Sequence, residues 1–355
     1  MADNTLATNR YGPTQHAIYS ELVDRLRDAE IEGLLDQERS FICRTRKGNR
    51  YWYSRRFVTE NGGDRREEHY LGPDTPELRE RIARLREQAQ DAKTAARARR
   101  RLVRQLVEVG FPYPDRRTGR VLEELARAGV FRLGGVLVGS HAFATYHGQL
   151  GVRLPEEHAK TSDVDVAAFA HVQIAISERA DPNLGDAIGR AERFLAVPSL
   201  NRKSPPTGWR TADKELKVEL LTPLIGRPKA SAALVPMMGA HADPIRFLDY
   251  LFVDTVPAVV LTGTGVLVRV PAPERYAVHK LIVARKRPPG DRTKRAKDRA
   301  QAASLLEVLL LDAPEDVAEA WADLVKRGKG WEQPARQTLK QLPDALTARF
   351  FEVVG

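Results

Sequence analysis

Two acidic residues separated by one position constrain this chain most, because of the segment that precedes them. Val136-Leu137-Val138 is typical of a buried strand and leads into Gly139-Ser140, while Asp163 and Asp165 alternate with valines further along. Side chains alternate between the two faces of a strand, so the two carboxylates share one face and the valines face a core. Adjacent carboxylates repel each other unless a cation lies between them, and Mg²⁺ prefers carboxylate and phosphate oxygens. The pattern therefore predicts a strand that carries a divalent-cation site.

The Gly139-Ser140 pair fits an anion beside that site. Glycine lets a backbone approach a phosphate closely, and the first turn of a helix presents unpaired N–H groups to an anion. We expect a helix to begin at this pair. An Asp-x-Asp pair alone is common in solvated surface turns, so the prediction depends on the strand before it and on a second acidic strand after it.

These residues resemble the DNA polymerase β-like nucleotidyltransferase superfamily, in which a strand ends in Gly-Ser or Gly-Gly, Asp-x-Asp follows, and a third carboxylate lies on a later strand. By this resemblance Glu219, within the apolar run Leu216–Pro223, is the third carboxylate, where the family more often has Asp. The order of Phe194–Pro198, Pro205–Thr207 and Pro273–Leu281 resembles a bacterial branch of nucleotidyltransferase-fold proteins.

The resemblance implies transfer of a nucleoside monophosphate from an NTP to an acceptor, with release of pyrophosphate and with Mg²⁺ or Mn²⁺ as cofactor. The acceptor could be RNA, a protein or a small molecule. The resemblance assigns catalysis and metal binding to three carboxylates, and nucleotide binding to the glycine–serine turn and two lysines: Asp163, Asp165 and Glu219, then Gly139, Ser140, Lys280 and Lys297.

The basic and histidine residues near the proposed site can also be accounted for without a role in the reaction. Lys280 and Lys297 lie in a basic stretch from Arg275 to Arg299, and a solvated helix face explains them equally well. For His279 we favour packing or capping over catalysis. A Ser140–His141 nucleophilic pair is disfavoured, because sequence neighbours rarely supply the geometry that such a pair requires.

Composition limits the environment and the partners. The chain has 355 residues, is 42% hydrophobic and carries a formal net charge of +10, which favours polyanionic partners such as nucleotides and nucleic acids. The single cysteine, Cys43, excludes an intramolecular disulfide and a cysteine-ligated zinc cluster, so we expect a cytoplasmic protein. We expect no membrane span, because even the apolar stretch 256–270 is interrupted by threonines, glycines and Arg269 and is typical of paired strands.

The first 73 residues predict a small β unit. A helix at 17–28 precedes three strands at 41–46, 50–57 and 67–71, separated by turn sequences that contain glycine and asparagine. Tyr51, Trp52 and Tyr53 lie between Arg50 and the pair Arg55-Arg56 and could stack on bases while the arginines neutralise phosphates. Aromatic side chains that simply pack one face of a small sheet explain them as well, and we favour that interpretation.

The predicted fold class is α+β, with a nucleotidyltransferase-type mixed sheet, flanking helices, an N-terminal antiparallel β unit and a C-terminal helical region. We expect four parts: residues 1–73, a long basic connecting helix at 74–110, a catalytic domain at 111–270 and the C-terminal helices at 271–355. The expected elements of the last two parts are helices at 118–129, 184–196, 273–287 and 291–311, strands at 135–138, 163–169 and 217–221, an irregular segment at 226–242, and a polar loop at 201–207 that links strands or contacts phosphate, of which we favour linking.

Two other functions stay open. A degenerate site, with Glu219 in place of the usual Asp, would leave a protein that binds nucleotide or nucleic acid without chemistry. The second is that of a toxin-like enzyme that transfers a nucleotide to tRNA or protein.

Overall fold

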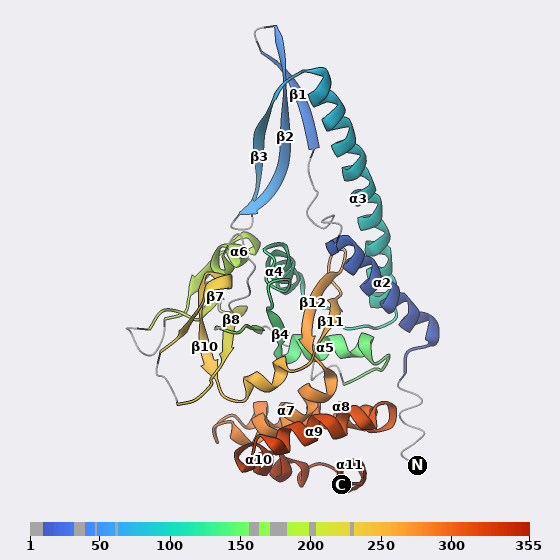
Figure 1. Ribbon diagram of the computed structural model, residues 1–355, viewed down its shortest axis with the longest axis vertical. Coiled ribbons are helices and arrows are strands. Elements are labelled where there is room, and N and C mark those ends of the chain that lie inside the picture. Colours follow the sequence, from blue (N-terminus) through green and yellow to red (C-terminus); the bar gives the residue numbers. More distant parts are fainter. Residues whose placement is uncertain are drawn as a thin grey trace.

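The chain forms a body around a mixed β-sheet, and a small sheet and a long helix project from that body (Figure 1). The computed structural model describes residues 10–31, 40–46, 48–60, 63–155, 163–170, 183–198, 204–227 and 231–355, without the side chains of 56–60, 63–65 and 67. The predicted turn at 61–64 and polar loop at 201–207 therefore lie partly outside the described residues.

The N-terminal part contains the predicted three-stranded antiparallel sheet. Strands β1, β2 and β3 pair in that order, after a first helix α2 that begins earlier than expected because proline is well suited to a first helical turn. Their bounds are Pro13–Ile31 for α2, Ser40–Arg46 for β1, Asn49–Glu60 for β2 and Gly63–Pro73 for β3.

The long helix α3, Pro76–Glu108, matches the predicted connecting helix. Thr75 caps its start by accepting a hydrogen bond from the N–H of Leu78 at 3.2 Å. With 33 residues the helix is roughly 50 Å long. Its C-terminal half packs on α2 through buried Val103 and Leu106, so the small sheet is joined to the body by an anchored helix.

The central sheet follows the order β4-β5-β8-β10-β9, and β6-β7 is attached to β8 through β7. Strands β5, β8 and β10 are mutually parallel, whereas β4, β7 and β9 each run antiparallel to the strand that they join. The elements of this region are α4 Arg116–Arg127, β4 Val136–Val138, α5 Gly139–Gln149, β5 Asp163–Ala167, α6 Leu184–Ala191, β6 Phe194–Ala196, β7 Gly208–Thr211, β8 Lys217–Pro223, β9 Ala233–Val235, the 3₁₀ turn η3 Pro236–Met238, β10 Ala240–Ile245 and the 3₁₀ turn η4 Leu248–Phe252.

Two expectations for this region are wrong. The helix expected at 184–196 ends at Ala191, and Phe194–Ala196 form strand β6, because the backbone at Glu192 is extended. The segment 226–242, expected to be irregular, contains β9 and the start of β10. Ala240 and Ala242 are buried and alternate with partly exposed side chains, a strand pattern that is too short to recognise in isolation.

The rest of the chain is a β-hairpin followed by helices. The hairpin confirms the paired strands expected at 256–270, and the C-terminal helices form the lower layer in Figure 1. The elements are β11 Thr255–Val260, β12 Val266–Pro271, α7 Pro273–Lys286, α8 Arg292–Asp312, α9 Pro314–Lys326, α10 Lys329–Leu339 and α11 Asp344–Val354.

One large apolar core joins the central sheet to these helices. It contains Val164 and Val166 of β5, Val218 and Leu220 of β8, and side chains of α4 to α9, so one face of β5 and β8 is closed to water. The predicted α+β class is confirmed, with a mixed sheet, an N-terminal antiparallel sheet and C-terminal helices. None of the described helices combines the length and apolar character needed to cross a membrane.

Candidate active site

The glycine–serine turn lies directly against one of the predicted carboxylates. Strand β4 is fully buried and ends at Val138, and Gly139 begins α5 with a positive φ of 68°. A Cβ atom at position 139 would lie 2.6 Å from Oδ2 of Asp165. Both the backbone conformation and this close approach require glycine. The start of α5 therefore lies beside the carboxylate strand, as expected.

Strand β5 presents both aspartates on the face of the sheet that points away from the large apolar core. Val164 and Val166 are fully buried, while Asp163 and Asp165 are partly exposed. This alternation confirms the predicted orientation of the strand.

Glu219 of β8 lies opposite Asp165. The two residues are direct partners in the parallel pairing of β5 and β8, and Asp163 is the partner of Lys217. Adjacent strands lie about 4.8 Å apart, so all three predicted carboxylates share one small area of this face. The carboxylate of Glu219 is turned along its own strand, where Oε1 lies 2.6 Å from Nζ of Lys217.

Burial and the neighbouring carboxylates raise the pKa of Asp165. Burial, followed by the negative charges of Glu219 and Asp163, raises this pKa from 3.8 to about 6, against the opposing effects of Lys280 and Lys217. An ionised Asp165 is therefore costly unless positive charge compensates for it.

A fourth carboxylate of this face was missed in the sequence. Asp243 of β10 pairs with Leu221, two residues beyond Glu219 on the same face. Burial and then Glu219 raise the pKa of Asp243. The sequence signal for Asp243 is its place next to the alternating apolar residues Ala240 and Ala242. The expectation that 226–242 is irregular hid this strand.

The two predicted lysines approach the carboxylates in different ways. Lys280 on α7 is buried, and its Nζ lies 2.6 Å from Oδ1 of Asp298, which also accepts a hydrogen bond from Arg287. Lys297 on α8 is partly buried. Burial and then Lys280 lower its pKa, while Asp298, Asp163 and Asp165 act in the opposite direction, so Lys297 lies within the electrostatic field of the site.

Tyr276 of α7 joins the turn to the C-terminal helices. Its buried hydroxyl lies 2.9 Å from the carbonyl oxygen of Gly139 and 3.0 Å from Oε1 of Gln301 on α8. Tyr276 therefore positions the turn. The sequence indicated a helix here but gave no role to this tyrosine.

Two histidines near the site are buried in their neutral form. Burial lowers the pKa of His279 to about 3, and neither of its ring nitrogens has a hydrogen-bond partner among the described residues. Burial lowers the pKa of His141 to about 4, and its Nε2 has no partner within the same part of the chain. His279 thus lies in the core, as we favoured, and Nε2 of His141 does not activate Ser140.

The donor set fits a hard divalent cation, although the side chains are not arranged around one. Oxygen donors from Asp163, Asp165 and Glu219 share a face, and burial together with the other two carboxylates raises the pKa of Asp165, so added positive charge would favour its ionised form. Within the described residues, no three His, Cys, Asp or Glu side chains are placed to hold a metal ion as they stand. Glu219 would have to leave Lys217 to complete such a set.

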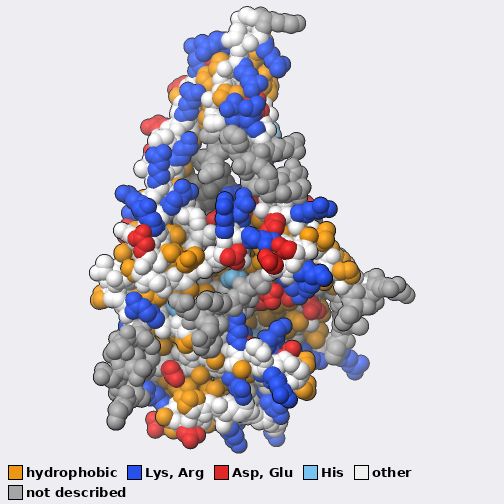
Figure 2. Space-filling model, turned by 180° about the vertical axis from the view of Figure 1, so that it is seen from behind, with side chains coloured by type: hydrophobic (Ala, Val, Ile, Leu, Met, Phe, Trp, Pro, Cys, Tyr) orange, Lys and Arg blue, Asp and Glu red, His pale blue; other side chains and the backbone are white. Residues whose placement is uncertain are grey.

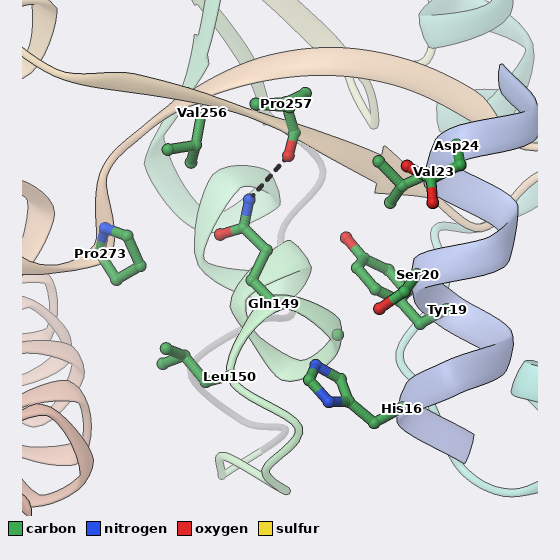
Figure 3. A pocket seen from close by; sticks show the side chains of 11 residues that line it. His16, Tyr19, Ser20, Val23, Asp24, Gln149, Leu150, Val256, Pro257 and Pro273 are labelled. Atoms are coloured by element: carbon green, nitrogen blue, oxygen red, sulfur yellow. Dashed lines mark hydrogen bonds between the residues drawn. The ribbon is translucent and has the colours of Figure 1, made fainter. Parts of the chain in front are cut away.

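A separate apolar hollow of about 370 Å³ lies at the other end of α5 from Gly139 (Figure 3). Tyr19 and Val23 of α2 face Leu150 and Pro273 across it, and Nε2 of Gln149 donates a hydrogen bond to the carbonyl of Pro257 at 3.1 Å. Among its described lining residues only Asp24 is acidic, so this hollow lacks the carboxylate cluster of the β5 and β8 face.

Comparison with known proteins gives one match, to a protein family. A family model described as nucleotidyltransferase matches residues 116–326, which is more than half of the chain. The match begins at α4 and ends with α9, so it contains the turn, the four acidic positions and both lysines. No curated protein and no solved structure matches the chain.

Proposed function

The chain belongs to the nucleotidyltransferase family, and from this premise we propose that it transfers a nucleoside monophosphate from an NTP to a hydroxyl group of an acceptor, RNA, protein or small molecule. The acceptor oxygen forms a bond to the α-phosphorus, the bond from that phosphorus to the bridging oxygen breaks, and pyrophosphate leaves. The hydroxyl proton passes to solvent or to a carboxylate of the site. Placement in a bacterial branch of the superfamily and the four-part division of the chain stay predictions.

The observation that carries this proposal is the register of β5 and β8. It places Asp165 opposite Glu219, with Asp163 on the same face and Gly139 in contact with Asp165. Acidic side chains from two strands beside a helix start form a combined cation and phosphate site.

Asp163, Asp165 and Glu219 would hold Mg²⁺ or Mn²⁺. When bound, the cation neutralises charge on the phosphates and lowers the pKa of the attacking hydroxyl. Before it binds, the chain's own task is to keep these carboxylates ionised near neutral pH, and the lysines contribute to this because Lys280 and Lys217 lower the pKa of Asp165. Lys217 also forms a 2.6 Å ion pair with Glu219, which keeps the Glu219 carboxylate on its own strand until a cation competes for it.

Gly139, Ser140 and Lys297 are the proposed phosphate-binding groups. The N–H groups at the start of α5 would attract an anion, and Lys297 supplies positive charge within the field of both aspartates. Lys280 acts on the site from a distance, because its ammonium is paired with the carboxylate of Asp298. We therefore propose that Lys280 contributes through its charge more than through direct contact with phosphate.

The test is incubation with each α-labelled NTP, Mg²⁺ or Mn²⁺, and separate fractions of cellular RNA, protein and small metabolites. We expect label to enter one fraction with wild-type protein and to be absent with Asp165→Asn. Asp91→Asn, which makes the same chemical change on the exposed face of α3, is the matched control and should transfer normally. Equal labelling by wild type and Asp165→Asn would contradict the proposal.

The ion pair of Lys217 with Glu219 favours a second candidate, a degenerate protein that binds nucleotide or nucleic acid without transfer. That function predicts salt-sensitive RNA or DNA binding and no pyrophosphate release from any NTP.

A further inference from the structure

The small N-terminal sheet has two different faces, and one of them is covered by α3. Trp52 of β2 is buried on that face, its Nε1 donates a hydrogen bond to Oδ1 of Asp74 at 2.7 Å, and the guanidinium of Arg86 lies 5.0 Å from its ring centre. The packing role favoured for the aromatic run thus holds for Trp52. The neighbouring residues Tyr51 and Tyr53 are not covered by α3 in this way and stay partly exposed.

Tyrosines gather on the opposite, open face. Tyr51 and Tyr53 of β2 alternate with Trp52, and Tyr53 pairs with Tyr70 of β3. The ring of Tyr70 lies 5.5 Å from that of Tyr53 and 6.1 Å from that of Tyr51, and Tyr70 is 57% exposed. Helix α6 of the body also contacts β2, and Tyr51 and Tyr53 stay partly exposed. Three neighbouring rings therefore remain partly open to solvent.

Arginines surround these rings. Arg44 of β1 is paired in register with Tyr51, and its guanidinium lies 5.7 Å from the ring centre of Tyr53. Arg46 lies two residues beyond Arg44 in β1 and therefore on the same face. Among the side chains that the structure describes in this sheet, this face carries one acid, Glu68, and four arginines, which are Arg44, Arg46, Arg55 and Arg66. Glu68 is shared by Arg44, Arg55 and Arg66, and Arg46 lies outside that group.

Tyrosine and arginine together line a shallow hollow at the β1–β2 end of the sheet. Its volume is about 590 Å³, and its lining residues are Arg46, Asn49, Tyr51, Tyr53 and Tyr70. In the ribbon view the sheet stands away from the body (Figure 1), and the rear view shows Lys and Arg side chains over the projecting part of the molecule (Figure 2). The surface is accessible to a long partner.

We propose that this surface, defined by Arg44, Arg46, Tyr51, Tyr53 and Tyr70, binds single-stranded RNA. Exposed aromatic rings stack on unpaired bases, and neighbouring arginines neutralise phosphates. A duplex keeps its bases stacked on one another and offers the rings no such faces. RNA is favoured over DNA because each tyrosine hydroxyl can exchange a hydrogen bond with a ribose 2′-hydroxyl. The positive charge disfavours basic protein partners, and the proposal does not depend on nucleotidyl transfer.

The experiment measures fluorescence anisotropy of a labelled RNA of mixed sequence, about 12 nucleotides long, which spans a typical single-strand site. It uses the full-length protein in EDTA and without NTP. Single-stranded DNA of the same sequence, duplex RNA and an acidic peptide serve as competitors. We expect the RNA strand to bind most tightly. Equal binding of the DNA strand would overturn the assignment to RNA, and stronger competition by the duplex or the acidic peptide would overturn the proposal.

Variants locate the binding to the surface. Tyr70→Ala should weaken binding roughly 5- to 100-fold, the effect of losing one base stack, whereas Tyr70→Phe keeps the ring and most of the affinity. Tyr113→Ala, at an exposed tyrosine between α3 and α4, is the matched control and should bind as wild type does. Wild-type affinity for both Tyr70→Ala and Tyr51→Ala would overturn the proposal.

Charge is tested separately. Arg46→Gln should reduce the slope of log affinity against log salt by about 0.7, the value for one lost phosphate contact on a single strand. Lys326→Gln removes the same charge from the exposed end of α9 and should leave the slope unchanged. Asp165→Asn should bind RNA as wild type does, which separates this proposal from the transfer reaction.

Discussion

Replacing Asp165 by Asn should stabilise the metal-free protein near neutral pH. Burial, Glu219 and Asp163 raise the pKa of Asp165 from 3.8 to about 6 in the folded protein. Between these values the unfolded chain binds fewer protons than the folded one, so stability falls as the pH rises from about 4 to about 6. A pKa difference of about 2 corresponds to about 3 kcal/mol, which is an upper value because Asp165 keeps some contact with water. Asn carries no charge and avoids this penalty.

The assay is urea unfolding of both proteins in EDTA, followed by circular dichroism at several pH values between about 4 and about 7.5, a range that spans the titration. We expect Asp165→Asn to match wild type near pH 4 and to be about 2 kcal/mol more stable above about pH 6.5. The control Asp91→Asn should follow wild type throughout. A stability difference between Asp165→Asn and wild type that does not change across this range would refute the argument, because only titration of Asp165 makes it depend on pH.

Three further changes test the site. Gly139→Ala places a Cβ 2.6 Å from Asp165 at a φ of 68°, so transfer should fall by roughly 10-fold or more in a labelled-NTP assay, while Gly290→Ala, at an open position, should be silent. Tyr276→Phe removes the hydroxyl that contacts Gly139, and we expect a loss of about 1 kcal/mol in urea unfolding and a lower kcat with a smaller change in KM; an unchanged kcat would exclude its positioning role. Lys217→Met releases Glu219 from its ion pair, so Mn²⁺ should bind more tightly by electron paramagnetic resonance titration, and weaker binding would show that Lys217 supports the site.

The sequence predicted the acidic strands because alternation is a local property. Val164 and Val166, which alternate with the aspartates, define the buried face of β5, and Val218 and Leu220 do the same around Glu219 of β8. The resemblance to a known superfamily then supplied the expectation that these strands belong to one site. Their pairing in register, Asp165 opposite Glu219, agrees with it.

The parts that the sequence did not predict depend on contacts between distant segments. Asp243 joins the acidic face only because β10 pairs with β8, and β10 is too short to recognise alone. The ion pair of Lys280 with Asp298 depends on how α7 packs against α8. The tyrosine face depends on which side of the small sheet α3 covers. Trp52 lies on the covered side, where it donates a hydrogen bond to Asp74, and the run of three aromatic residues does not reveal this.

A crystal structure with Mn²⁺ and an NTP analogue that cannot be cleaved between its α- and β-phosphates tests the central claim most directly. We expect anomalous signal from Mn²⁺ at the carboxylates of Asp163 and Asp165, with Glu219 released from Lys217 and the phosphates against the Gly139-Ser140 turn. Nucleotide and Mn²⁺ bound elsewhere, with the Glu219–Lys217 pair intact, would contradict the account.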